Sequence, residues 1–148
     1  MITKESHTLR KCCLYASDFH LEMILLPYIK ENINKSNFVI FSQNDLSGTI
    51  KILLDRVNIE DKEKKCIINL NWKQTAIEDI LNNSLNKSNQ DIHIIINGDY
   101  NYIKEVNNKI KILGDNIHIV DCFNVNDEKI DVNLIKEIYQ EIINTSKI

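Results

Sequence analysis

The clearest sign of the fold is the stretch Ile92-His93-Ile94-Ile95-Ile96, which is followed directly by the polar residues Asn97-Gly98-Asp99. A continuous run of β-branched residues is typical of a strand that is covered on both faces, as in a parallel sheet. Four further runs have this character, and a polar break and a stretch with helical spacing follow each of them: Cys12 to Ala16, Phe38 to Phe41, Cys66 to Leu70 and Ile117 to Val120. The alternation predicts an α/β protein, a three-layer α/β/α sandwich around a mainly parallel sheet of about five strands.

The stretches between the runs predict the helices. We expect the first helix to run from about His20 to Asn34 and to be kinked at Pro27, or to be regular only from about Leu26. An apolar stripe from Ile103 to Leu113 predicts a later helix that Gly114 would cap. The last helix is expected to begin near Val132, to include Ile142 and to run nearly to the end of the chain.

The bulk composition excludes several classes of protein. The chain has 148 residues, which fits a single domain over residues 1–148. Its net charge of −3 comes from interleaved acidic and basic residues without a basic block, which disfavours nucleic acid as a partner. No run approaches the roughly 20 apolar residues of a membrane span, and Met1 to His7 holds no apolar signal core, so we expect a cytoplasmic protein. The four cysteines form no C-x-x-C pair and are interpreted as buried free thiols.

Ligands of parallel α/β sheets bind at the carboxyl ends of the strands, so the residues after each run are the candidate site. The side chain of Trp72 would form an apolar wall there and Asn71 would orient a ligand, although packing under the polar segment Asn82 to Gln90 is an equally good interpretation of the indole. The residues that we predict to line this cleft are Tyr15, Asp18, Asn44, Asn71, Trp72 and Asp99.

Several classes of enzyme can be considered from the same strand ends. Neither G-x-x-x-x-G-K-[ST] nor G-x-G-x-x-G is present, and Ala16-Ser17-Asp18 holds no glycine, so neither a nucleotide triphosphatase nor a dehydrogenase is expected, and no cofactor. Three aspartates, Asp18, Asp45 and Asp99, could gather around Mg²⁺ in a small nuclease or phosphotransferase. The favoured interpretation is that they cap helices, because their oxygens accept first-turn amide protons.

His93 and His118 occupy equivalent places near the amino ends of two predicted strands. If those strands are neighbours, the imidazoles could face each other and titrate together near pH 6.5. A structural role, with each ring held by hydrogen bonds, is the favoured interpretation.

Several segments resemble a known family. Cys13-Leu14-Tyr15, the helix segment Leu25 to Ile33 and the strand segment Asn37 to Phe41 resemble the start of the MEDS domain, the methanogen and methylotroph sensory domain. Ile117 to Phe123 and the helix from Val132 to Ile143 are similar to the last strand and helix of that family. The resemblance implies a relative of the RecA and KaiC ATPase fold that has lost its phosphate loop.

The resemblance also implies a function. Members of this family are sensory or regulatory modules without catalysis, associated with a kinase or a transcription regulator. We therefore expect a non-enzymatic module that binds a small ligand or a signalling protein at the carboxyl ends of its strands. The alternatives are the Mg²⁺-dependent enzyme described above and a structural adaptor that binds partners through an exposed helix face.

Overall fold

The computed structural model describes residues 9–33, 36–68, 70, 91–110, 117–139 and 141–143, and for Asp18 and Asn37 it describes the backbone alone. Five strands are described: β1 (Leu9–Tyr15), β2 (Ser36–Ser42), β3 (Asp91–Asn97), β4 (Ile117–Asn124) and β5 (Glu141–Ile143). They form one sheet with the order β2-β3-β4-β1-β5, and every neighbouring pair is parallel. The predicted parallel sheet of about five strands is therefore confirmed.

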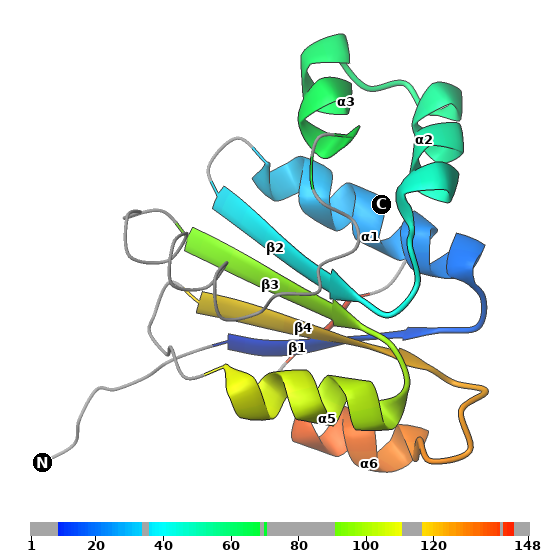
Figure 1. Ribbon diagram of the computed structural model, residues 1–148, viewed down its shortest axis with the longest axis vertical. Coiled ribbons are helices and arrows are strands. Elements are labelled where there is room, and N and C mark those ends of the chain that lie inside the picture. The colour runs from blue at the N-terminus through cyan, green and yellow to red at the C-terminus, as the bar shows by residue number, and fades with distance from the viewer. Residues whose placement is uncertain are drawn as a thin grey trace, which may run out of the picture.

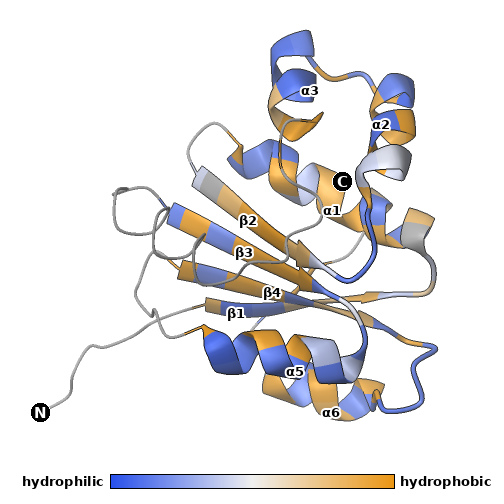
Figure 2. Ribbon diagram, viewed as in Figure 1, coloured by the Kyte–Doolittle hydropathy of each residue, from blue (hydrophilic) through white to orange (hydrophobic). Residues whose placement is uncertain are grey.

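Helices cover both faces of this sheet. The described helices are α1 (Asp18–Asn32), α2 (Ser47–Arg56), α3 (Asp61–Ile68), α5 (Tyr100–Lys109) and α6 (Val132–Ile138). Figure 1 shows α1, α2 and α3 on one side of the strands and α5 and α6 on the other. This arrangement confirms the three layers, and it explains why the strands are apolar along most of their length (Figure 2).

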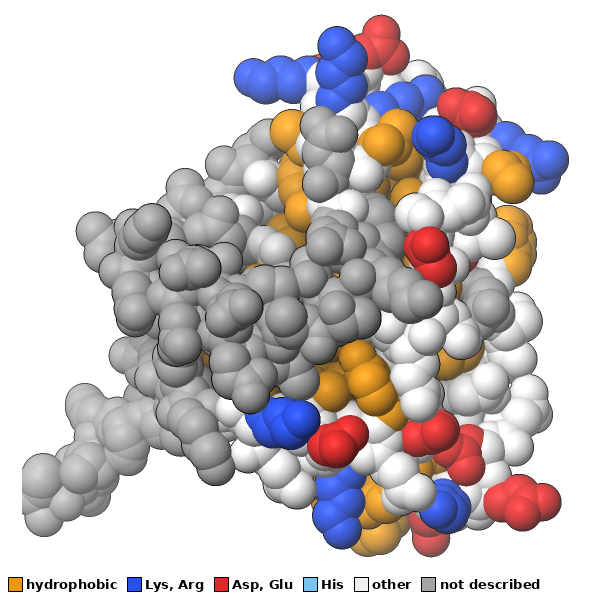
Figure 3. All heavy atoms as spheres, viewed as in Figure 1, with side chains coloured by type: hydrophobic (Ala, Val, Ile, Leu, Met, Phe, Trp, Pro, Cys, Tyr) orange, Lys and Arg blue, Asp and Glu red, His pale blue; other side chains and the backbone are white. Residues whose placement is uncertain are grey.

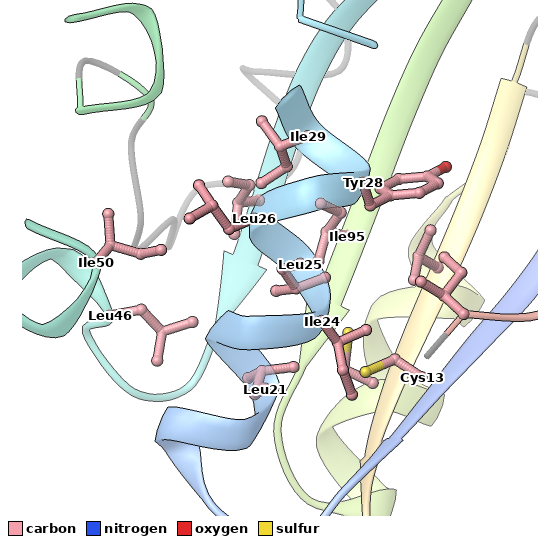
Figure 4. Close-up of a cluster of buried hydrophobic side chains, with 14 of the residues drawn as sticks. Cys13, Leu21, Ile24, Leu25, Leu26, Tyr28, Ile29, Leu46, Ile50 and Ile95 are labelled. Atoms are coloured by element: carbon pink, nitrogen blue, oxygen red, sulfur yellow. The ribbon is translucent and has the colours of Figure 1, made fainter. Parts of the chain in front are cut away.

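Two hydrophobic clusters hold the layers together, one on each face of the sheet. Successive residues of β3 point to opposite faces, so Ile95 belongs to the cluster under α1 and Ile94 to the cluster under α5. Figure 4 shows that α1 is itself buried on two sides: Ile24 lies toward the strands, and Leu26 lies toward Ile50 of α2. The helix thus links the sheet to the outer helices α2 and α3.

The predicted strand from Cys66 to Leu70 is wrong. Asp61–Ile68 forms helix α3, in which Cys66 is exposed and only Ile67 is buried. A run of three or four apolar residues does not separate a strand from one side of a helix. Here the charges favour the helix, because Asp61 and Glu63 lie in its first turn and Lys65 in its last turn.

The fifth strand comes from the end of the chain, where a continuous helix was predicted. Helix α6 ends at Ile138, and Tyr139 is extended. Glu141–Ile143 then pairs with β1, which places Ile142 opposite Cys12 and buries Ile143. The edge of β1 offers backbone partners that a longer helix would leave unused, and β-branched residues favour the strand.

Two helix boundaries also differ from the prediction. Helix α1 begins at Asp18 and continues past Pro27, so its regular part does not start near Leu26. The side chain of Ser17 accepts a hydrogen bond from the amide of His20 and caps this first turn. Helix α5 ends at Lys109 with Ile110 extended and buried, and Gly114 lies outside the described residues.

Candidate functional site

A cleft of about 310 Å³ lies at the carboxyl ends of four strands. Helix α1 follows β1 on one face of the sheet, and α5 follows β3 on the other face (Figure 1), so the connections diverge at this edge, where α/β sheets usually have a crevice. The cleft residues are those that line this space: Tyr15, Gln43, Asn44, Gly98, Asp99, Asn124, Asn126 and Asp127.

A chain of buried hydrogen bonds forms the floor of the cleft. The hydroxyl of Tyr15 donates to Asn97 Oδ1 over 2.7 Å, and Asn97 Nδ2 donates to Ser42 Oγ over 3.0 Å. The hydroxyl of Ser42 then donates to the backbone carbonyl of Asn44 over 2.6 Å. Asn97 has no exposed surface, and Tyr15 and Ser42 have almost none. Because these side chains are joined by successive hydrogen bonds, the ends of β1, β2 and β3 are held in a defined arrangement.

A reciprocal contact between Gln43 and Asp99 forms one wall. Gln43 Oε1 accepts from the backbone amide of Asp99 over 2.7 Å, and Gln43 Nε2 donates to Asp99 Oδ2 over 3.3 Å. Gly98 lies directly beneath this contact, since a Cβ atom there would stand 2.6 Å from Gln43 Oε1 and 2.5 Å from a ring carbon of Tyr102. The loops after β2 and β3 therefore touch each other through a position that only glycine fits without a shift.

The opposite wall is the turn after β4. Asn126 Nδ2 donates to the carbonyl of Ala16 over 3.2 Å and ties this turn to the end of β1. Asp127 Oδ2 accepts from the amide of Tyr100 over 3.1 Å, and Asp127 Oδ1 accepts from the amide of Lys129 over 3.0 Å. The Asp127 carboxylate is thus fixed at the start of α5, close to where Asp99 caps the same helix through Tyr102.

Three of the predicted site residues are brought together in the cleft: Tyr15, Asn44 and Asp99. Asp18 begins α1 three residues after Tyr15, and its side chain is not described. Asn71 and Trp72 lie outside the described residues, and the strand that was expected to precede them is absent because α3 occupies that segment.

The sequence interpretation missed one whole wall of the cleft. It ended the apolar run at Val120 and expected the strand's carboxyl end directly after it, whereas β4 continues to Asn124. The useful signal was the polar stretch from Asn124 to Asp127, which follows Phe123 directly.

Asp121 itself lies inside the sheet and is 1 % exposed. Its carboxylate accepts from Asn107 Nδ2 over 2.9 Å and from the hydroxyl of Tyr139 over 2.5 Å. Burial raises the pKa of Asp121 above its ordinary value, and these two hydrogen bonds oppose the rise. Asp121 therefore joins β4 to α5 and to the end of α6, and it does not line the cleft.

Two of the three aspartates considered for the alternative Mg²⁺ site, Asp45 and Asp99, accept hydrogen bonds at the starts of helices. Asp99 Oδ1 caps α5, and Asp45 Oδ1 accepts from the amide and the hydroxyl of Ser47 at the start of α2. Asp45 is not among the cleft residues. Within the described part of the chain, no three His, Cys, Asp or Glu side chains are grouped in a way that could hold a metal ion.

The two histidines meet at the other end of the sheet. His93 of β3 pairs in register with His118 of β4, and their rings stack with centroids 4.3 Å apart. The ring of Phe38 stacks on the other face of His93 at 4.8 Å. Tyr28 of α1 lies edge-on to His93, and its hydroxyl is 2.6 Å from His93 Nδ1.

Both ring nitrogens of His93 have hydrogen-bond partners. The hydroxyl of Tyr28, which also accepts from Lys11 Nζ, is the partner of His93 Nδ1, and Ser36 Oγ is the partner of His93 Nε2. Burial lowers the pKa of His93 to about 3, and the positive charges of His118 and Lys11 lower it further. The hydrogen bonds of His93 agree with the favoured structural role, and its lowered pKa does not fit the alternative in which both rings titrate near pH 6.5.

No protein-family model matches this chain, and comparisons with curated protein sequences and with solved structures find no match either. None of the described helices is long and apolar enough to cross a membrane. On the face that Figure 3 shows, acidic and basic side chains are intermixed.

Proposed function

We propose that this chain is a non-catalytic sensory or regulatory module that binds a small polar ligand in the cleft at the carboxyl ends of its strands. The observation that carries the proposal is the cleft itself. Eight residues from four strand ends surround about 310 Å³, a volume at the lower end of the range for small-molecule sites. The hydrogen bonds of its floor and walls hold these groups in place before any ligand arrives, which reduces the entropic cost of binding.

The lining favours a neutral or positively charged ligand. Asp99 and Asp127 are the charged side chains among the cleft residues, and the amides of Gln43, Asn44, Asn124 and Asn126 supply further acceptors and donors. Both carboxylates accept backbone amides but retain free acceptor capacity, because each oxygen has two lone pairs. A polyol or an amine would satisfy these acceptors, whereas a phosphate would be repelled by them.

The first strand-to-helix connection also favours a ligand without a phosphate group. It consists of Ala16 and Ser17, and Ser17 Oγ already accepts from the amide of His20 in the first turn of α1. A phosphate site needs free amides at a helix N-terminus, usually beside glycines. This is consistent with the proposed relation to MEDS domains, which resemble ATPases without a phosphate loop. We further propose that the module acts in the cytoplasm on a separate signalling protein, such as a kinase or a transcription regulator.

The ligand class can be tested with four probes and isothermal titration calorimetry. Glucose represents polyols, putrescine represents amines, and inorganic phosphate and Mg²⁺-ATP represent anions. We expect saturable binding of putrescine or glucose and none of the anions. The variant Asp127→Asn should weaken putrescine binding at least about tenfold, because a hydrogen bond to a charged group typically contributes roughly 1.5–3 kcal/mol.

The matched control is Asp55→Asn, which removes the same charge from the exposed surface of α2, away from the cleft. It should leave the affinity unchanged. Micromolar binding of Mg²⁺-ATP, or equal effects of the two substitutions, would contradict the proposal.

A further inference from the structure

A second cavity, larger than the cleft, lies between α1 and α2. Its volume is about 350 Å³, and it is separate from the carboxyl ends of the strands, since it shares no residue with the cleft. Its apolar walls come from two helices and the segment after α2: Met23, Leu26, Pro27, Leu53, Val57 and Ile59. We refer to this cavity as the α1–α2 groove.

The geometry of the two helices explains why the groove stays open. Met23, Pro27 and Lys30 are spaced by four and three residues, so they form one stripe along α1. Leu53 and Val57 form the facing stripe. Helix α2 ends at Arg56 and the backbone of Val57 is extended, so the chain from Val57 to Ile59 runs along the groove as one of its walls.

The floor and the mouth of the groove differ in chemistry. Leu26 and Leu53 are each 5 % exposed and form part of the core cluster on this face. Met23, Val57 and Ile59 are only partly buried and pack against that cluster from the solvent side. The polar lining consists of Asn58 and Lys30, both exposed, and the ammonium group of Lys30 is the single charge among the lining residues.

An apolar cavity with one cation at its mouth is complementary to a molecule that has an apolar body and one negative charge. At roughly 30 Å³ for each water-sized group, the groove holds about ten to twelve methylene-sized groups. We propose that the α1–α2 groove binds a free monocarboxylate of the medium-chain fatty-acid class, with the chain against Leu26 and Leu53 and the carboxylate at Lys30. This site is independent of the cleft and of the function proposed for it.

The test uses the full chain and sodium decanoate, titrated by calorimetry below its micellar concentration. Decanol has the same chain without the charge, and butyrate has the same charge with a shorter chain. We expect decanoate to bind saturably with one site, decanol to bind more weakly, and butyrate to show no measurable heat. Absence of saturable decanoate binding would overturn the proposal.

Substitutions locate the site. Lys30→Gln should weaken decanoate about fivefold, which is near the upper limit for an exposed ion pair, and should leave decanol unchanged. Lys51→Gln is the matched control, because Lys51 is an exposed lysine of α2 that does not line the groove. Equal losses in the two variants would mean a general charge effect and would overturn the assignment.

A bulkier side chain should fill the groove. Val57→Phe should reduce the binding of decanoate and decanol at least tenfold, and Met23→Phe should do the same from the opposite wall. A thermal melt of each variant shows whether it is folded, so a folded variant at either position suffices for the test. Decanoate binding that persists undiminished in either folded variant would place the ligand elsewhere and would refute the proposal.

Discussion

The two ends of the sheet both carry polar and aromatic side chains, but they use them in different ways. At the amino end, His93 is 2 % exposed, stacked between Phe38 and His118, and both of its ring nitrogens have partners. At the carboxyl end, the hydrogen-bonded floor under Tyr15 supports an open cleft whose amides and carboxylates face free space. Polar groups that are paired in a closed environment contribute to stability and specificity of the fold, whereas groups that line a cavity are available to a ligand.

The largest expected effect is a loss of stability at acidic pH. The pKa of His93 is lowered to about 3 in the folded protein, while an unfolded histidine titrates near its ordinary value of 6.5. The unfolded chain therefore binds more protons, and stability falls as the pH decreases from about 6.5 toward 3. The slope approaches roughly 1.4 kcal/mol for each pH unit below 6.5, so His93 should lower the free energy of unfolding by about 2 kcal/mol between pH 6.5 and 4.5. Urea melts over this range measure the slope.

Two variants assign that slope to one end of the sheet. His93→Gln removes the titrating group from the amino end, so its stability should depend much less on pH than that of the parent protein. His20→Gln changes a histidine near the carboxyl end and leaves His93 in place, so the parent slope should remain. If His93→Gln keeps the full slope, the amino end is not the acid-sensitive region.

The second comparison removes one tyrosine hydroxyl at each end of the sheet. Tyr28→Phe deprives His93 Nδ1 and Lys11 of a partner in a closed environment, and it should cost about 2 kcal/mol of stability. Tyr15→Phe takes this donor from one buried acceptor, Asn97 Oδ1, whereas Tyr28→Phe affects two groups, so the cost of Tyr15→Phe should be smaller, about 1 kcal/mol. Denaturant melts give the two values.

The same two substitutions should affect ligand binding in the opposite order to stability. Tyr15→Phe disturbs the floor of the cleft and should weaken the binding of whichever probe, putrescine or glucose, occupies the cleft, while Tyr28→Phe should leave that affinity unchanged. Calorimetric titration of both variants measures the difference. A larger binding defect in Tyr28→Phe would show that the two ends are coupled.

The smallest expected effect compares two glycines. Gly98→Ala would push the side chains of Gln43 and Tyr102 aside and open one wall of the cleft, at a cost of about 1 kcal/mol. Gly48 lies in α2, where a Cβ atom would have nothing within 4 Å, so Gly48→Ala should stabilise the protein by up to about 1 kcal/mol. Thermal melts that show the same sign for both substitutions would contradict the close approach at Gly98.

Local patterns predicted four of the strands because their apolar runs are continuous and bounded by polar residues. Ile92 to Ile96 is the clearest example, and the buried strand β3 covers that run. The predicted strand at Cys66 failed because a short apolar run has no periodicity that distinguishes a strand from a helix. Strand β5 was not predicted for a different reason. It pairs with the edge of β1, which lies about 130 residues away in the sequence.

The sequence by itself determined the α/β class and the polar strand ends that include Tyr15, Asn44 and Asp99, because burial on two faces requires apolar runs and ligands do not bind inside them. Only the tertiary structure decided that Asn124 to Asp127 complete the cleft, that His93 stacks on His118, and that a groove remains between α1 and α2. The physical reason is that strand order and helix packing join residues that are distant in the chain. Their hydrogen bonds and pKa values depend on those neighbours, which no local pattern specifies.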